Sequence, residues 1–452
     1  MSHTVELHPL DAPYVAIQPV RSPPLSTGRA RPCGRMAVGL AMVLSVSLTA
    51  GPAWATTVLT LTEAQHLLVR DNPRLRALAA QAAALASQAV AVAQLPDPRL
   101  SVGIENAPLP NLALRQQQMS MLQFGVSQSF PPWGARTARR HRADYEAQAA
   151  RDGRREKRAE LVFVLRKAWL AALSIRATRN AVAAESQLAR ATLRAAQARY
   201  RTGRGAQYDV WRAQLAAGAL RNQWDHLKAD AAQAQFQIRR LLADPTLPPL
   251  DPRWPVLPLP SRRRGRLRLS HQPSLRAAQA QWRAGSAGVA LAKSAYWPAV
   301  TVSADYGQDF FPGSPNWLSV GLSFSLPIFP AERQDQGVDA ARARRLMAQY
   351  RYEDRYLALK RQFDSEYALY TAQSRERART DRVLLPVARA AFTATLAAYS
   401  AGRASLTAVL RAQQRILRYT LQSVRYRKDA SVAAAALDYL TTERVRGHGH
   451  DN

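Results

Sequence analysis

Cysteine is almost absent from this 452-residue sequence: the only one, Cys33, precedes a short apolar run near the N-terminus. A chain cleaved after that run has no thiol for a disulfide bond, for a thiolate metal site or for N-terminal acylation. These three kinds of covalent or metal stabilisation are therefore excluded for the exported part.

Long hydrophobic runs are missing as well. The apolar run at 36–50 is too short to span a membrane, follows several arginines, and is followed by the small residues of Ala53-Trp54-Ala55. We therefore predict a signal peptide and leader over 1–55, with a short membrane anchor as the alternative. No later segment has 18 consecutive apolar residues, so we expect an exported chain without a transmembrane helix.

Acidic residues are scarce, with 32 Asp and Glu against 63 Lys and Arg and a net charge of +31. Such a charge raises the question of nucleic-acid binding. The arginines are spread along nearly every helical segment rather than gathered on one stripe, and no nucleic-acid-binding motif accompanies them. We predict no nucleic-acid partner, and interpret the charge as solvated faces with some attraction to anionic surfaces.

Four landmarks recur in the same order about 200 residues apart, which indicates a tandem duplication. The pairs are 72–77 with 272–277, 97–104 with 297–304, 124–131 with 320–327, and 198–214 with 397–413. A connector at 245–265 carries seven prolines between positions 245 and 260 and cannot continue a helix. We predict a first repeat over 56–244 and a second over 266–446.

Proline is absent between Pro132 and Pro245, and only Pro386 follows Pro330. A helix from about Arg136 to Tyr200 would be on the order of 100 Å long, more than a compact domain needs. We expect Pro386 to kink the equivalent helix of the second repeat.

After each turn, apolar residues follow an unbroken three–four spacing that is typical of coiled-coil packing. The ten positions of the first repeat are Val210, Ala213, Ala217, Leu220, Trp224, Leu227, Ala231, Ala234, Ile238 and Leu241. Their counterparts 199 residues later are Val409, Ala412, Ile416, Tyr419, Ser423, Tyr426, Ala430, Ala433, Leu437 and Leu440. We interpret both seams as packing residues without a chemical role.

Four segments alternate apolar with small polar residues, the period of a strand: 98–106, 120–131, 298–307 and 317–328. A soluble, half-buried sheet and a membrane barrel wall both show this pattern, but the length suits a tilted membrane strand. Aromatic residues lie at one end of the second pair, at Phe310, Phe311 and Trp317. Four strands cannot close a barrel, and an open edge in lipid is costly. If these strands lie in a membrane, the chain must therefore share a barrel with other copies.

Two copies of helix, strand pair, long helix, Tyr-x-x-Gly turn and helix resemble the TolC-like outer-membrane efflux channels over roughly residues 57–445. The resemblance implies a mainly α fold with membrane β: long antiparallel coiled-coil helices and four transmembrane strands per chain. Three chains would form a twelve-stranded β-barrel continued by an α-helical barrel in the periplasm. It further implies a periplasmic adaptor and an inner-membrane pump as partners, outer-membrane lipid around the barrel, and no cofactor.

The resemblance makes the two turns, near 200–209 and 399–408, the periplasmic tips that dock onto the adaptor. The residues that would make this contact are Tyr200, Gly203, Arg204, Tyr399, Gly402 and Arg403. Glycine permits the tight turn, and arginine offers several donors to a partner backbone. The competing interpretation is that these are ordinary turn glycines and surface arginines.

Relatives often carry acidic residues just after the second tip, where they narrow the entrance. At these positions the sequence has Ala408 and Arg411, while the first repeat has Asp209 and Arg212. A cation-attracting entrance is therefore not expected. We predict that Asp209, Arg212 and Arg411 line the periplasmic aperture, and that charge contacts between Asp209 and either arginine control it.

Segments 97–108 and 125–140 resemble the subgroup that is paired with heavy-metal resistance-nodulation-division pumps. The tail at 447–452 contains two histidines, but we interpret it as a disordered tail and predict no metal site. Because phosphate-binding and nucleophile motifs are absent, we predict no enzyme. The alternative to an efflux channel is a periplasmic coiled-coil adaptor or scaffold without a channel.

Overall fold

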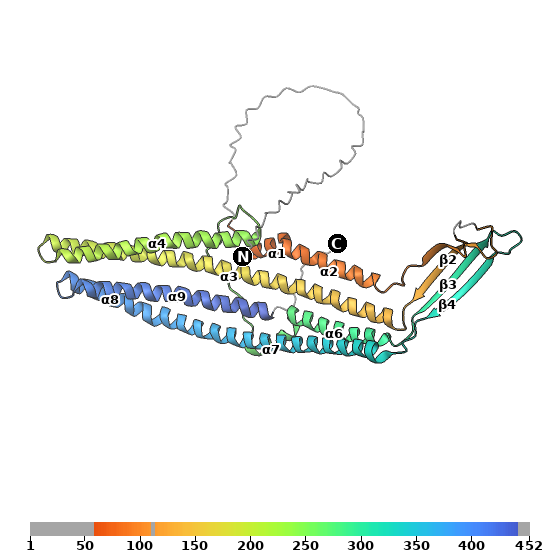
Figure 1. Cartoon of the computed structure of the whole chain (residues 1–452). Helices are drawn as coiled ribbons and strands as arrows, with labels where there is room; N and C mark the ends of the chain where they lie inside the picture. The colour runs from red at the N-terminus through yellow and green to blue at the C-terminus, as the bar shows by residue number, and fades with distance from the viewer. Residues whose placement is uncertain (1–57, 110–113, 442–452) are drawn as a thin grey trace, which may run out of the picture. The chain divides into compact units, whose positions relative to one another are not determined.

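The computed structural model describes residues 58–109 and 114–441 (Figure 1). The predicted leader (1–55) and tail (447–452) lie outside the described residues. Thr56–Asn452 forms one compact unit. The two repeats therefore fold together, and their boundaries stay predictions from the sequence.

The element order of the first half returns in the second, as the landmark pairs predicted. The first half contains α1 (Leu61–Asp71), α2 (Pro73–Ala91), β1 (Arg99–Glu105), β2 (Met121–Phe130), α3 (Ala135–Arg201) and α4 (Gln207–Leu242). The second contains α5 (Arg262–Arg268), a 3-10 turn η1 (Leu269–His271), α6 (Pro273–Ser294), β3 (Val300–Asp309), β4 (Trp317–Phe324), a π-helical turn η2 (Ala331–Asp335), α7 (Gln336–Arg379), a second π-helical turn η3 (Thr380–Leu384), α8 (Leu385–Ser400) and α9 (Leu406–Thr441).

Corresponding helices begin with the same local chemistry. Asn72 precedes Pro73 and accepts a hydrogen bond from the Arg74 amide through Oδ1 at 3.0 Å. In the second repeat, Gln272 precedes Pro273 and accepts from the Ser274 amide at 2.7 Å. Proline has no amide hydrogen and fits the first helical position, while the polar side chain satisfies an amide that the helix leaves free.

The helix α3 has 67 residues, which corresponds to about 100 Å. The four strands adjoin one end of the long helices, and both helical turns lie at the other end (Figure 1). In the second repeat, the turn η3 separates α7 from α8 directly before Pro386. The missing amide hydrogen of Pro386 and its ring disrupt the regular helix at the place where the sequence predicted a kink.

Both predicted seams are buried or half-buried along their whole length. Ala213, Leu220, Leu227, Ala234 and Ile238 form the buried part in α4, and α9 buries Val409, Ala412, Ile416, Ala430 and Leu437. The single polar position, Ser423, donates a hydrogen bond to Asp381 of η3. Its hydroxyl therefore has a partner where the second seam passes the irregular turn.

A polar cluster that the sequence analysis missed ties the repeats together at Glu156 of α3. Its carboxylate accepts hydrogen bonds from Gln272 Nε2 at 2.6 Å, from Arg355 of α7 at 3.5 Å and from the Tyr439 hydroxyl of α9. Glu156 thereby joins one helix of the first repeat to three elements of the second. Such a network fixes helix register, because every partner would be left unpaired after a shift.

The proline-rich connector is packed against the start of the described chain. Leu59 donates its amide to Pro249 O, and its carbonyl accepts from the Asp251 amide, both at 2.9 Å. Leu250 and Trp254 contact the hydrophobic core around Trp169. The connector therefore closes the helical bundle rather than forming a free spacer.

The four strands form one antiparallel sheet in the order β1-β2-β3-β4. The register aligns Val102 with Phe124, Phe124 with Tyr306, and Tyr306 with Leu318, so one face of the sheet is mainly apolar. Gln128 and Gln308 are polar residues on this face. The opposite face carries small and polar residues such as Ser101, Gly125, Asp305 and Ser319. The predicted alternation is confirmed.

The apolar face is bare in the single chain. Leu318 and Val320 are 73% and 75% exposed, and Leu100 is 74% exposed. The described part of the chain places no helix over these residues, and contiguous apolar areas of this kind mark a surface that another phase or partner covers. The described chain also leaves the outer edges of β1 and β4 without a paired strand.

Two details of the sheet differ from the prediction. β4 ends at Phe324 rather than near 328, because Pro327 has no amide for the ladder. Trp317 was expected among the aromatic residues at one end of the strand pair that would meet the lipid boundary. It pairs with Gly307 and lies on the polar face, opposite to Leu318. Aromatic residues that do continue the apolar face lie at the helical end of the sheet.

One helical stretch of the described residues, within Ala331–Ser400, contains a window of mean hydropathy 1.3 that would pass as a membrane span by length and composition. The apolar residues of this window belong to α8. Ala388, Phe392 and Tyr399 of α8 pack into a core with Val409 and Ile416 of α9. The window therefore reflects helix packing near the turns.

A buried carboxyl lies between the hairpins at Glu185 of α3, which is 4% exposed. Gln413 Nε2 of α9 donates to the main-chain oxygen of Glu185 at 3.5 Å, while Glu185 Oε1 and Gln413 Oε1 are both buried without a hydrogen-bond partner. Burial raises the pKa of Glu185 to about 7. A protonated Glu185 could donate to Gln413 Oε1 and would satisfy both oxygens.

We expect Glu185→Gln to remove a pH dependence of stability. Between the ordinary pKa of 4.5 and the folded value of about 7, the folded chain keeps a proton that the unfolded chain has lost. Wild-type stability therefore falls as pH rises through this window, by up to about 3 kcal/mol. Thermal unfolding of the detergent-solubilised chain, followed by circular dichroism from pH 4.5 to 8, measures this.

The control is Glu146→Gln, which changes a carboxyl of the same helix in a solvent-accessible ion pair with Arg142. This variant should behave like wild type. An equal pH slope in all three proteins would contradict the prediction.

Candidate functional site

The two helical turns have the same backbone structure. In the first, the amides of Gly203 and Arg204 donate to the carbonyls of Tyr200 and Arg199 at 3.0 and 2.9 Å. In the second, the amides of Gly402 and Arg403 donate to Tyr399 and Ala398 at 2.9 and 2.8 Å. This is the pattern of a helix end closed by a left-handed residue.

Glycine is required at the fourth position of the Tyr-x-x-Gly motif, because φ is +68° at Gly203 and +79° at Gly402. A side chain at such angles meets the following carbonyl and is strained. The duplicated Tyr-x-x-Gly motif is therefore explained first by backbone geometry.

Arg199 joins the two turns and was missed in the sequence analysis. Its guanidinium donates to Tyr399 O in the second turn and to Arg204 O at 2.8 Å in its own turn. It also lies over the Tyr399 ring, with 4.7 Å between Cζ and the ring centroid. The position 199 residues later is Ala398. This asymmetry between the repeats was the only sequence signal for Arg199.

The two tyrosines of the repeated motif have different environments. Tyr200 is 46% exposed, whereas Tyr399 is 2% exposed and its hydroxyl has no hydrogen-bond partner. Burial raises the pKa of Tyr399, Asp209 raises it further, and Arg199 opposes this shift. Tyr399 is thus placed as a packing residue beneath Arg199, and Tyr200 as a surface residue.

The predicted aperture residues lie just behind the turns. Asp209 is in the first turn of α4 and close enough to influence Tyr399. Arg212 donates to Thr407 Oγ1 of α9 at 2.7 Å and lies over the ring of Tyr208. Arg411 is exposed. The contact that Arg212 makes across the hairpins is therefore with a threonine, and control of the aperture by Asp209 stays a prediction.

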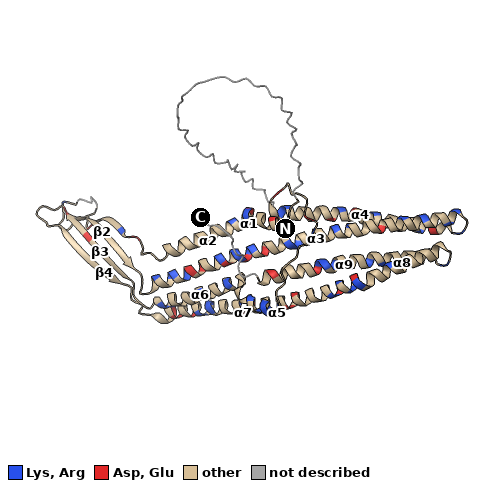
Figure 2. Cartoon of the chain, turned by 180° about the vertical axis from the view of Figure 1, so that it is seen from behind, with Lys and Arg blue, Asp and Glu red and all other residues tan. Residues whose placement is uncertain are grey.

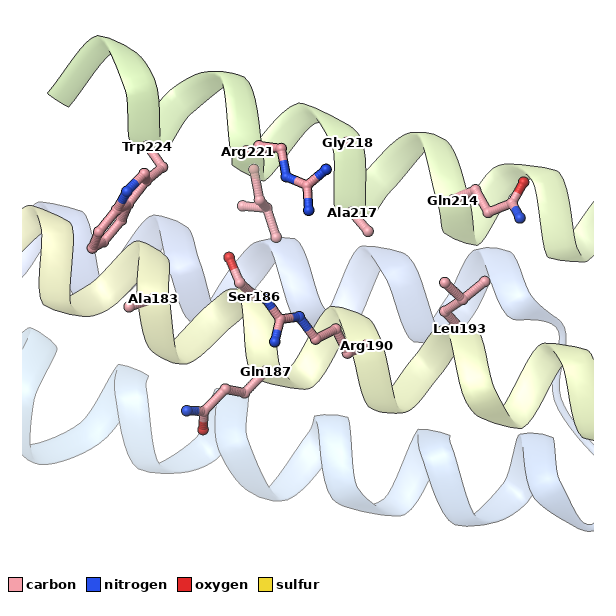
Figure 3. A pocket seen from close by; sticks show the side chains of 11 residues that line it. Ala183, Ser186, Gln187, Arg190, Leu193, Gln214, Ala217, Gly218, Arg221 and Trp224 are labelled. Atoms are coloured by element: carbon pink, nitrogen blue, oxygen red, sulfur yellow. The ribbon is translucent and has the colours of Figure 1, made fainter. Parts of the chain in front are cut away.

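A groove of about 670 Å³ runs between α3 and α4, on the side of the first hairpin (Figure 3). Arg190 and Arg221 project into it beside Gln187, Gln214 and Trp224. Its lining residues include no histidine, cysteine or carboxylate. Its hydroxyl group, that of Ser186, donates to the Val182 carbonyl of the same helix at 2.8 Å. Among the described residues, no cluster of three or more potential metal ligands occurs either.

The described chain combines a four-stranded sheet that has a bare apolar face with two long helical hairpins, and it shares this fold with solved outer-membrane channels. Solved structures support this fold. The chain is similar to the outer-membrane channel OprN, with 18% identity, a TM-score of 0.72, and coverage of 85% of this chain and 90% of OprN. It is similar to the outer membrane protein VceC of Vibrio cholerae, with 19% identity, a TM-score of 0.72, and coverage of 84% of this chain and 96% of VceC. It is also similar to CusC, with 16% identity, a TM-score of 0.73, and coverage of 87% of this chain and 95% of CusC.

The family model described as outer membrane efflux protein matches residues 266–442. This segment covers α6, β3, β4, α7, α8 and α9, most of the second repeat. A comparison with curated protein sequences gave no match.

We expect Arg199→Ala to loosen the contact between the turns. The change removes two charge-assisted hydrogen bonds and a cation–π contact, together worth about 2 kcal/mol at a half-buried site. Hydrogen exchange of the amides at 399–405 should become faster by about tenfold or more. The matched control is Arg201→Ala, an exposed arginine at the end of the same helix. Unchanged exchange in the Arg199 variant would show that the hairpins are held together elsewhere.

Proposed function

We propose that three copies of this chain form the outer-membrane channel of a tripartite efflux system, which conducts its cargo passively. The observation that carries the proposal is the sheet: one apolar face is bare, and in the described chain both edge strands are unpaired. In lipid, each unpaired backbone group at an edge costs several kcal/mol, so the edges must meet other strands.

The strand order supports closure between copies. Because neighbouring strands in the order β1-β2-β3-β4 are antiparallel, β1 and β4 run in opposite directions. The β4 edge of one copy can therefore pair with the β1 edge of the next in an antiparallel ladder, as closed membrane barrels require. One copy falls short of the smallest barrels, and three copies supply twelve strands, the number implied by the resemblance to TolC-like channels.

The competing function, a periplasmic scaffold without a channel, is disfavoured by the same sheet. A scaffold dissolved in water would expose the face that contains Leu100, Val320 and Leu322. Large exposed apolar patches of this kind are uncommon on soluble monomers. The basic residues along the long helices, in contrast, suit a water-facing surface (Figure 2).

The helical turns are proposed to dock onto a periplasmic adaptor that leads to an inner-membrane pump of the resistance-nodulation-division type. Tyr200, Arg204 and Arg403 are exposed at the ends of the hairpins, and Gly203 and Gly402 keep the turns tight. Tyr399 supports the turns from below and would not touch the partner directly. The proposed docking surface thus consists of one tyrosine and two arginines, and the two glycines give the turns their backbone conformation.

We expect the double variant Arg204→Glu/Arg403→Glu to weaken adaptor binding by at least tenfold, because charge reversal replaces donors with acceptors at both turns. Binding of the trimer in detergent to a purified periplasmic adaptor of a resistance-nodulation-division pump measures this. The control variant, Arg221→Glu/Arg425→Glu, makes the same charge change at two exposed arginines away from the turns. Equal losses in both variants would indicate general electrostatics, and no loss in either would refute docking at the turns.

The membrane sheet itself is tested by a matched pair on adjacent positions of β4. Val320→Asp places a charge on the apolar face, which is unfavourable in lipid. Ser319→Asp places the same charge on the polar face. We expect native mass measurements of outer-membrane extracts to give a trimer for wild type and Ser319→Asp, and a strongly reduced trimer for Val320→Asp. A soluble monomer for all three would overturn the channel.

The same three proteins address the cargo. We infer heavy-metal cations from the resemblance of segments 97–108 and 125–140 to channels of heavy-metal pumps, and Glu105 and Asp305 place carboxylates on the polar face of the sheet. Wild type and Ser319→Asp should restore growth on zinc or copper salts to a strain lacking the channel, and Val320→Asp should not. Restored growth on organic toxins alone would assign a different cargo to the same channel.

A further inference from the structure

A hollow lies at the helical end of the sheet, where β2 passes into α3. It has a volume of about 660 Å³ and is bounded by residues 93–95, which follow α2, and by Phe130, Trp133, Arg136 and Arg140. Phe130 pairs with Val300 and belongs to the apolar face. The hollow is therefore continuous with the surface that the proposed function places in lipid.

The aromatic and basic groups at the hollow have the arrangement of a membrane–water boundary. Trp133 is 86% exposed, directly beyond the last residues of β2. Arg136 and Arg140 follow within two helical turns, and Figure 2 shows basic residues at this end of α3. Tryptophan favours the headgroup level, and arginine just outside an apolar zone attracts anionic lipid.

The arginines lie at the N-terminal end of α3, where the helix dipole disfavours positive charge. The first turn of α3 has no acidic residue, and Arg136, Arg139, Arg140 and Arg142 occupy its first eight residues. Positive charge at a helix N-terminus is unfavourable, because the free amides already give this end a positive potential. Stability of the helix alone does not account for them, whereas an anionic partner would.

The second repeat supplies an internal comparison. At the offset of 196 that relates β2 to β4, Arg136 corresponds to Glu332, Arg139 to Asp335 and Arg140 to Gln336. The strand-to-helix junction therefore folds in this chain with acidic or neutral residues at these places. The second junction has a smaller hollow of about 390 Å³ that contains a single arginine, Arg333, beside Trp297. The pair of arginines therefore distinguishes the hollow of the first repeat from that of the second.

Arg136 is held in position by the fold, since its Nε donates to Ala93 O at the end of α2 at 3.0 Å. Arg140 has one neighbouring carboxylate, Asp144, at 3.6 Å on the exposed helix surface. Both guanidinium groups can thus reach the rim of the hollow, while Phe130 and Leu95 provide its apolar side.

We propose that this hollow binds an anionic glycerophospholipid, with the phosphodiester on Arg136 and Arg140, the headgroup beside Trp133, and the acyl chains along the apolar face next to Phe130. The inference rests on the proposed placement of the sheet in the membrane. Arginine is suited to a phosphate because its planar fork can donate two parallel hydrogen bonds.

The test is native mass spectrometry of the purified full chain in detergent, titrated with dioleoylphosphatidylglycerol and separately with dioleoylphosphatidylcholine. We expect preferential retention of the anionic lipid, and about fivefold weaker binding for each arginine removed in Arg136→Gln/Arg140→Gln. The single variant Arg140→Gln leaves the contact of Arg136 with α2 intact and should show the smaller loss.

The control variant, Arg139→Gln/Arg142→Gln, removes the same charge from the same turns but from residues that do not line the hollow. An equal loss in this variant would overturn the site in favour of diffuse attraction. Equal retention of both lipids, or displacement of the lipid by millimolar inorganic phosphate, would overturn it as well. The same spectra report the oligomer, so loss of the trimer would refute the channel separately from the lipid site.

Discussion

Backbone hydrogen bonding in lipid is the constraint on which the rest of this structure depends. The described chain has four strands with an apolar face, which is unfavourable in water, and two open edges, which are unfavourable in hydrocarbon without partner strands. In the proposed channel, closure with further copies would satisfy the edges and leave the polar face around a wet interior. The long helices would then leave the barrel in the same direction from every copy, with all the turns at the far end.

The duplicated sequence does not produce two equivalent halves. The turns share their hydrogen bonds and their left-handed glycines, but Arg199 has no counterpart at Ala398, and Tyr399 is buried where Tyr200 is exposed. At the other end of the helices, Arg136 corresponds to Glu332. Duplication conserves the positions that the backbone requires, and the positions between them have diverged into different contacts.

Much of the fold could be predicted because its patterns are periodic and long. The seams of α4 and α9, the alternation of the strands and the proline-free helices each extend over many residues, so isolated exceptions such as Ser423 or Gln128 do not hide them. Less of the candidate site could be predicted from the sequence. Arg199, Glu156 and Glu185 act through partners that are more than 100 residues away in the sequence, and nothing in their local pattern separates them from solvated charges.

The sequence by itself determined the repeat order, the strand faces and the glycine turns, since these follow from local periodicity and from backbone geometry. Only the tertiary structure decided which tyrosine is buried, which arginine joins the two turns, and where the helices and the sheet enclose a basic hollow. The physical reason is that burial and pairing depend on which distant segments become neighbours, and packing of one repeat against the other sets this.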